Sequence, residues 1–141
     1  MKRYFLIAGI IIVLDQTAKA LARAYVPLGS SAQLLPFMKL SHILNTGSAF
    51  GLFKGMNVVL IVVSILVIGY LLYKTKTICA EKHLPIWCGL VLGGAVGNLV
   101  DRLVFGAVTD FIDFGFWPAF NVADSALTVG VIGLLWHFRK E

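Results

Sequence analysis

The chain has 141 residues, of which 59% are hydrophobic and 13% are charged, about half the charged share of a typical soluble domain. This balance excludes an ordinary soluble protein and indicates one integral membrane domain, residues 1–141. The net charge of +5 comes from short basic clusters between apolar runs. The chain has no basic stripe with interleaved aromatic residues, so the sequence argues against nucleic-acid binding. Two cysteines and three scattered histidines predict neither a disulfide framework nor a His-based metal site.

Four apolar segments approach the roughly 20 residues that a helix needs to cross a bilayer. They are residues 4–24, 56–73, 84–100 and 119–138. The first imitates a secretory signal peptide, because Lys2 and Arg3 precede a short apolar run. Its pattern continues to Ala24 and further spans follow, so a retained helix is expected. The predicted fold class is an all-α polytopic membrane protein with four transmembrane helices.

Basic residues predict the orientation of these spans. They occupy the N-terminus, the connector between the second and third spans, and the C-terminus: Lys2, Arg3, Lys74, Lys76, Lys82, Arg139 and Lys140. The positive-inside rule places these segments, and both termini, in the cytoplasm. Residues 25–55 and 101–118 then form outer loops. Within the first loop, MKLSHIL partly alternates apolar and polar residues, which predicts a small β-element on the membrane; an irregular loop is the alternative.

The third span carries small residues at helical spacing. Gly89, Gly93, Gly94 and Gly97 form a ridge that lets helix backbones approach closely in lipid. We expect this ridge to pack helices together, with only an indirect role in function.

The predicted orientation gathers polar side chains near the outer face. They are Asp15, Asn98, Asp101, Arg102, Asp110, Asp113, Asn121 and Asp124. Ionisable groups in a membrane are costly and are therefore functional candidates. Each also has a structural alternative: Asp15 can pair with Lys19 four positions later, and Asp101 can form an ion pair at the helix end.

Asp124 near the start of the fourth span has two interpretations. Asn121 and Asp124 have the spacing of an N-cap residue and an N3 acid, so capping alone could account for them. Aspartyl proteolysis needs a second carboxylate nearby: one group takes a proton from water while the other, protonated, polarises the scissile carbonyl. Asp110 and Asp113 are both candidates, and their spacing does not choose between them. Similarly, Asn45 can serve the site or only build a turn.

Five segments, in this order and covering nearly the whole chain, resemble the lipoprotein signal peptidases, the signal peptidase II family of bacterial membrane aspartyl proteases. They are DQTAK (15–19), NTGSAF (45–50), GGAVGNLVDR (93–102), VTDFIDF (108–114) and FNVADSA (120–126). The resemblance implies a small extracytoplasmic β-cradle beside the four helices and a location in the bacterial cytoplasmic (inner) membrane. It also implies Asp110 and Asp124 as the catalytic pair.

By the same resemblance, the residues that bind substrate or support the site are Asp15, Lys19, Asn45, Gly47, Asn98, Asp101, Arg102 and Asn121. Asp113 becomes a neighbour without a catalytic role. The chain departs from the family pattern at Ala18, where a Ser or Thr is usual before the lysine.

The implied substrate is a diacylglyceryl-modified prolipoprotein, cleaved on the N-terminal side of its lipidated Cys, with membrane lipids as the surroundings. No cofactor or metal is implied, and a monomer is expected. Two other functions are weighed against this one. A metal-dependent phosphotransferase would bind Mg²⁺ through its carboxylates, but here the Asp residues are spread over three motifs. A proton-coupled or assembly subunit would use Asp15, Lys19 and Asp124 as relay or packing contacts.

Overall fold

The computed structural model describes residues 1–47 and 55–139. Its elements in chain order are α1 (Lys2–Tyr25), β1 (Ser31–Leu35), β2 (Met38–Asn45), α2 (Asn57–Tyr73), α3 (Thr75–Ala80), α4 (Leu84–Phe105), β3 (Val108–Asp113) and α5 (Val122–Phe138). By length and composition, α1 and α4 can cross a membrane, whereas the apolar helices α2 and α5 are shorter. The second half of the NTGSAF motif and Lys140 lie outside the described residues.

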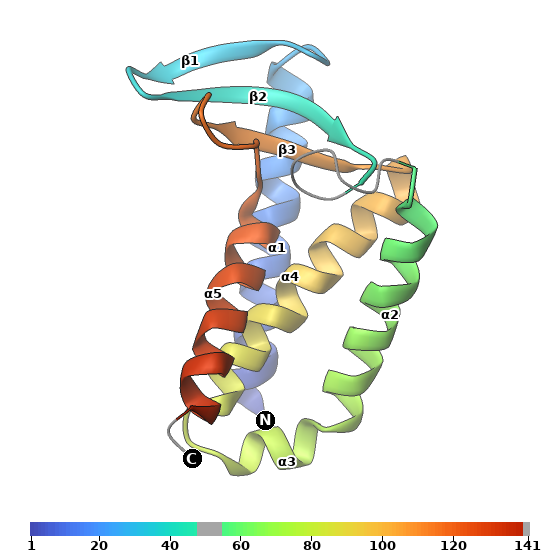
Figure 1. Cartoon of the computed structure of the whole chain (residues 1–141), viewed down its shortest axis with the longest axis vertical. Coiled ribbons are helices and arrows are strands. Elements are labelled where there is room, and N and C mark those ends of the chain that lie inside the picture. The colour runs from blue at the N-terminus through green and yellow to red at the C-terminus, as the bar shows by residue number, and fades with distance from the viewer. Residues whose placement is uncertain (48–54, 140–141) are drawn as a thin grey trace.

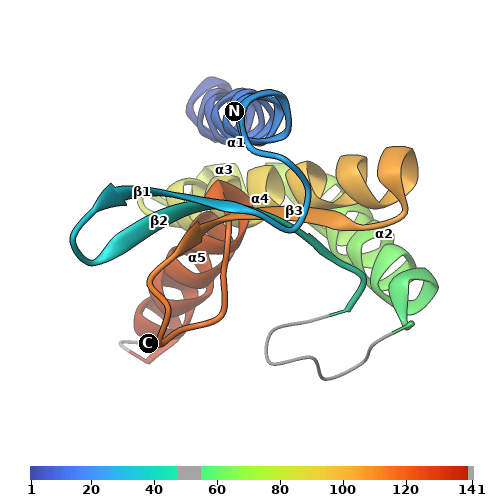
Figure 2. The same cartoon turned by 90° about the horizontal axis from the view of Figure 1, so that it is seen from above.

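The helices form a bundle around α4, which packs against α1, α5 and α2. The three strands lie across one end of this bundle, and α3 lies at the opposite end with the start of α1 and the end of α5 (Figure 1). Seen along the bundle, α1 is on one side of α4, and α2 and α5 are on the other (Figure 2). The basic segments of the described chain are therefore gathered at the end away from the sheet.

The glycines of α4 allow these close approaches. A methyl group on Gly93 would lie 2.7 Å from Ile11 Cβ in α1, and one on Gly94 would lie 2.5 Å from the Ala123 carbonyl oxygen in α5. The predicted packing role of this ridge is confirmed.

The ends of α4 follow from local sequence. Pro85 lies in the first turn, where no intrahelical N–H bond is lost, and Gly106 ends the helix with a left-handed φ of 71°. The helix continues past residue 100, where the third span was expected to end, to Phe105, and it carries Asp101 and Arg102 within it. The side chains of Asp101 and Arg102 are surrounded by other parts of the protein, so these polar residues do not end the helix. The fourth span was expected from residue 119, and α5 begins at Val122 with Asn121 as its N-cap.

The strands form an antiparallel sheet in the order β1-β2-β3. The predicted β-element at MKLSHIL is confirmed as β2, but β1 and β3 were not predicted. Asp110 pairs with Ile43 of β2, and beyond β3 the chain returns so that Phe120 exchanges backbone hydrogen bonds with Ile112. This return brings the start of α5 next to β3.

Candidate active site

The first turn of α5 is held by a capping box. The Asn121 side chain accepts a hydrogen bond from the Asp124 N–H at 2.8 Å, and an Asp124 carboxylate oxygen accepts one from the Asn121 N–H at 3.3 Å. The capping interpretation of Asp124 is therefore confirmed. It uses one carboxylate oxygen, Oδ2, and leaves Oδ1 for another contact.

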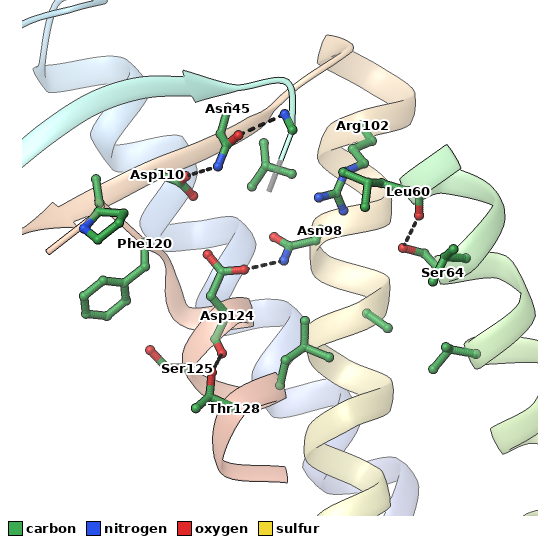
Figure 3. A pocket seen from close by; sticks show the side chains of 18 of the residues that line it. Asn45, Leu60, Ser64, Asn98, Arg102, Asp110, Phe120, Asp124, Ser125 and Thr128 are labelled. Atoms are coloured by element: carbon green, nitrogen blue, oxygen red, sulfur yellow. Dashed lines mark hydrogen bonds between the residues drawn. The ribbon is translucent and has the colours of Figure 1, made fainter. Parts of the chain in front are cut away.

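That contact comes from α4, where Asn98 Nδ2 donates to Asp124 Oδ1 at 2.8 Å. Asp110 on β3 faces Asp124, and the two carboxyl groups point toward one another (Figure 3). Asn121 joins them, because its Nδ2 donates to Asp110 Oδ1 at 2.7 Å while its side-chain oxygen caps Asp124. The structure thus brings together the two carboxylates that the family resemblance selects.

Asn45 supports the same pair from β2. Its Nδ2 donates to Asp110 Oδ2 at 3.0 Å, and its Oδ1 accepts from the Gly47 N–H at 2.9 Å. Asn45 therefore builds a turn and also contacts Asp110. Asp113 points elsewhere: it accepts from Ser41 Oγ at 3.0 Å and does not line the cavity beside Asp124.

Asp110 is 2% exposed. The pKa of its carboxyl is raised from 3.8 to about 7, mainly by burial and next by the nearby charge of Asp124. Hydrogen bonds from Asn45 and Asn121 act in the opposite direction but are smaller. A carboxyl group with a pKa near neutrality can carry a proton at physiological pH, as one member of a proton-sharing pair must.

A second polar layer lies behind this pair, between α1 and α4. Asp15 and Lys19 are both fully buried and form the predicted i,i+4 ion pair at 2.7 Å. The other oxygen of Asp15 accepts the Ala123 N–H at 2.9 Å, so α1 caps the second position of α5. A methyl group on Gly97 would lie 2.6 Å from Asp15 Oδ2, which shows that this glycine makes room for the carboxylate. Burial of these charges is tolerated because each has partners.

Asp101 forms the interhelical ion pairs that the sequence suggests. Its Oδ2 lies 3.5 Å from Arg23 and 3.7 Å from Lys19, and it accepts the Thr109 N–H at 2.9 Å. The last bond ties α4 to β3 one residue before Asp110. Asp101 therefore holds the strand and does not face the carboxylate pair.

A cavity of about 720 Å³ opens beside the carboxylate pair, between α2, α4 and α5. Asn45, Asn98, Arg102, Asp110 and Asp124 form its polar end, and Arg102 points into it (Figure 3). Below them the walls are largely apolar, with Leu60, Val63, Val67, Ala95, Leu127 and Val129. The buried Nε of Arg102 has no hydrogen-bond partner among the described residues.

Sequence reasoning missed two side chains that connect these layers. Gln16 donates to Asp101 at 3.1 Å and to the Gly97 carbonyl at 3.0 Å. Arg23 donates to Thr109 Oγ1 at 2.9 Å and stacks over the Phe105 ring. Both are polar residues within the mostly apolar helix α1. That position in the sequence could have identified them as candidate site residues. Thr17 of the same motif is exposed, so its hydroxyl does not replace the one absent at Ala18.

Two facing carboxylates, one buried and one half-buried, lie at the end of an apolar helix bundle and define the class of protein, an aspartic peptidase associated with a membrane. Comparison with known proteins gives the family. Residues 7–140 match the sequence model of signal peptidase (SPase) II. A lipoprotein signal peptidase of Shouchella clausii is 43% identical over 97% of this chain and 95% of its own, and one of Halothermothrix orenii is 36% identical over 96% and 97%.

A solved bacterial membrane enzyme superposes with a TM-score of 0.92 at 29% identity, covering 99% of this chain and 89% of that one. A second one superposes with a TM-score of 0.86 at 28% identity, covering 100% and 95%. The chain belongs to the signal peptidase II family, the lipoprotein signal peptidases, and is an aspartic peptidase of bacterial membranes.

Proposed function

We propose that Asp110 and Asp124 are the catalytic pair with which this peptidase cleaves diacylglyceryl-modified prolipoproteins on the N-terminal side of the lipidated Cys. The observation that carries the proposal is the Asn121 side chain, which contacts both residues at once. This amide links the Asp110 carboxylate on β3 to the backbone N–H of Asp124 on α5, so it holds the two residues at one place. The capping of α5 by Asn121 and Asp124 does not require Asp110 to lie beside them.

The chemistry follows from the two protonation states. The ionised carboxylate takes a proton from a water molecule, whose oxygen attacks the scissile carbonyl carbon, while the protonated carboxyl donates its proton to the carbonyl oxygen. When the tetrahedral intermediate collapses, the C–N bond breaks and the leaving nitrogen receives a proton from the pair. The products are a new carboxylate on the signal peptide and a free amino group on the lipidated Cys.

The cavity suits a substrate with these parts. Its polar end offers the Asn98 amide and the Arg102 guanidinium to main-chain or ester carbonyls. Its apolar walls suit acyl chains and a hydrophobic signal helix, because both are transferred from lipid without loss of hydration. The side chains of Asp15, Lys19 and Asp101 lie behind the pair and outside this cavity, where they support the site.

Within the same proposal, four helices cross the inner membrane as one domain, with both termini cytoplasmic. Each of α2 and α5 has 17 residues, the lower end of the range that spans a bilayer. The basic segments at the end of the bundle away from the sheet support the orientation by the positive-inside rule. The sheet then forms an extracytoplasmic cradle, and the carboxylate pair lies near the outer face.

The test is cleavage of a purified, lipidated prolipoprotein by wild-type protein and by Asp110→Asn and Asp124→Asn. Each substitution keeps the size of the side chain but removes its acid-base function, so we expect cleavage to fall below detection while the folded fraction stays near wild type. Asp113→Asn is the matched control, because Asp113 bonds to Ser41 on the sheet. It should keep most of its activity.

Substantial cleavage by either Asn variant of the pair would overturn the assignment, and a loss in Asp113→Asn equal to that in Asp110→Asn would mean that the wrong carboxylate was selected. A chelator added to the wild-type reaction tests the alternative of metal-dependent phosphotransfer. We expect turnover to continue, and its loss on chelation would contradict a pair that works without metal. Catalytic turnover by the purified wild-type protein would exclude the other alternative, a proton-relay or assembly subunit.

A further inference from the structure

The two carboxylates of the pair are held by different kinds of donor. Asp110 accepts from the amides of Asn45 and Asn121, and the side-chain oxygens of both amides accept from backbone N–H groups. Asp124 Oδ1 accepts from the amide of Asn98, whose oxygen accepts from Lys19 Nζ at 3.0 Å. Among residues 1–47 and 55–139, only the chain of contacts behind Asp124 ends in a buried cation.

That cation determines which way the Asn98 amide points. An ammonium group can only donate hydrogen bonds, so it must face the amide oxygen, and the NH₂ group is left to face Asp124. A flipped amide would place its NH₂ group against Lys19 and its oxygen against the carboxylate. Both contacts of the flipped form would be repulsive. Lys19 is fully buried, so water cannot relieve them.

The direct field of Lys19 at Asp124 is a weaker effect. Asp15, at 2.7 Å, offsets most of its charge, and Asp101 lies 3.7 Å away. The other charged groups that act around Asp124 are Asp110 on β3 and Arg102 on α4. A donated hydrogen bond to the charged form of an acid stabilises that form, whatever the net charge behind it. The orientation of the amide is therefore the larger contribution.

Resting on the proposed function, we propose that Lys19 is a positioning residue: it holds the Asn98 amide toward Asp124 and so makes Asp124 the ionised member that takes the proton from water. Asp110 is then the member that carries the proton to the substrate carbonyl. The same division of roles suits the burial of Asp110 and its pKa of about 7.

The test is the pH profile of kcat/KM on the lipidated substrate. Asn98→Asp preserves shape and keeps an oxygen for Lys19, but it replaces the donor to Asp124 with an acceptor. We expect the acidic limb of the profile, where Asp124 must lose its proton, to move up by about one pH unit or more. Lys19→Met combined with Asp15→Asn removes the cation without leaving Asp15 as an unpaired buried charge, and Asp101 keeps Arg23 as its partner. The same limb should move in the same direction.

Arg23→Met is the matched control, because it removes a neighbouring α1 cation that contacts Asp101 and Thr109, not Asn98. Its acidic limb should stay in place even if the variant is less stable. An unmoved limb in Asn98→Asp would overturn the division of roles. A shift in Asn98→Asp without one in the Lys19 double variant would overturn the positioning role of Lys19. Failure of the proposed function is distinct, because Asp110→Asn or Asp124→Asn would then still cleave the substrate.

Discussion

The contact between α4 and α5 at Gly94 allows a test of whether close helix packing fixes the position of Asp124 on α5. In Gly94→Ala the new methyl carbon would lie 2.5 Å from the Ala123 carbonyl oxygen and 2.8 Å from Leu127 Cγ, whereas ordinary contacts begin at 3.4 Å. The oxygen belongs to the backbone of α5, so it cannot move without the helix. The two helices must separate by about 1 Å next to Asp124.

Such overpacking costs about 1–3 kcal/mol, of which the better helix propensity of alanine recovers at most about 1 kcal/mol. A displacement of ~1 Å at a reacting group can also lower turnover by about 100-fold. We therefore expect Gly94→Ala to unfold at lower denaturant in detergent micelles and to cleave substrate slowly. Gly9→Ala is the control, since its methyl would meet no atom within 4 Å. Equal stability and wild-type cleavage in the two variants would refute the tight contact.

Two further predictions concern Asp110 and Arg102. The pKa of Asp110 rises from 3.8 to about 7 on folding, so the folded protein keeps a proton that the unfolded chain releases; its contribution to stability is complete below about pH 4 and is lost as the pH rises toward 7. Asp110→Asn should flatten this slope in unfolding midpoints measured from pH 4 to pH 8, and an unchanged slope would contradict the buried, protonated carboxyl. Arg102→Gln should raise KM by about tenfold or more, because a charged donor is removed from the polar end of the cavity. A fall in kcat at constant KM would show that this side chain acts on the reaction and not on binding.

The sequence predicted features that depend on neighbours along the chain. The Asp15–Lys19 pair and the Asn121–Asp124 capping box were both readable, because four or three positions along a helix place two side chains together. The helix ends were less accurate. Hydropathy falls where Asp101 and Arg102 begin, but these side chains are paired or turned into a cavity, so α4 continues past them.

The spacing of Asp110 and Asp113 in the sequence could not decide which of the two faces Asp124. Residues three apart lie on opposite faces of a strand and on a similar face of a helix, so the answer depends on a strand that the sequence did not predict. β3 forms because β2 supplies one edge and the return of the chain at Phe120 supplies backbone partners on the other. Family resemblance had already selected Asp110, and the strand supplies the geometric reason.

The sequence by itself determined a membrane-embedded helical protein with carboxylates near one face, because apolar runs and local spacing act through the nearest residues. Only the tertiary structure decided which of those carboxylates face each other and what holds them. Asn98, Lys19 and Asp124 are far apart along the chain, and they meet only because glycines let α1, α4 and α5 approach closely. Buried polar groups must find partners, and packing decides which partners are within reach.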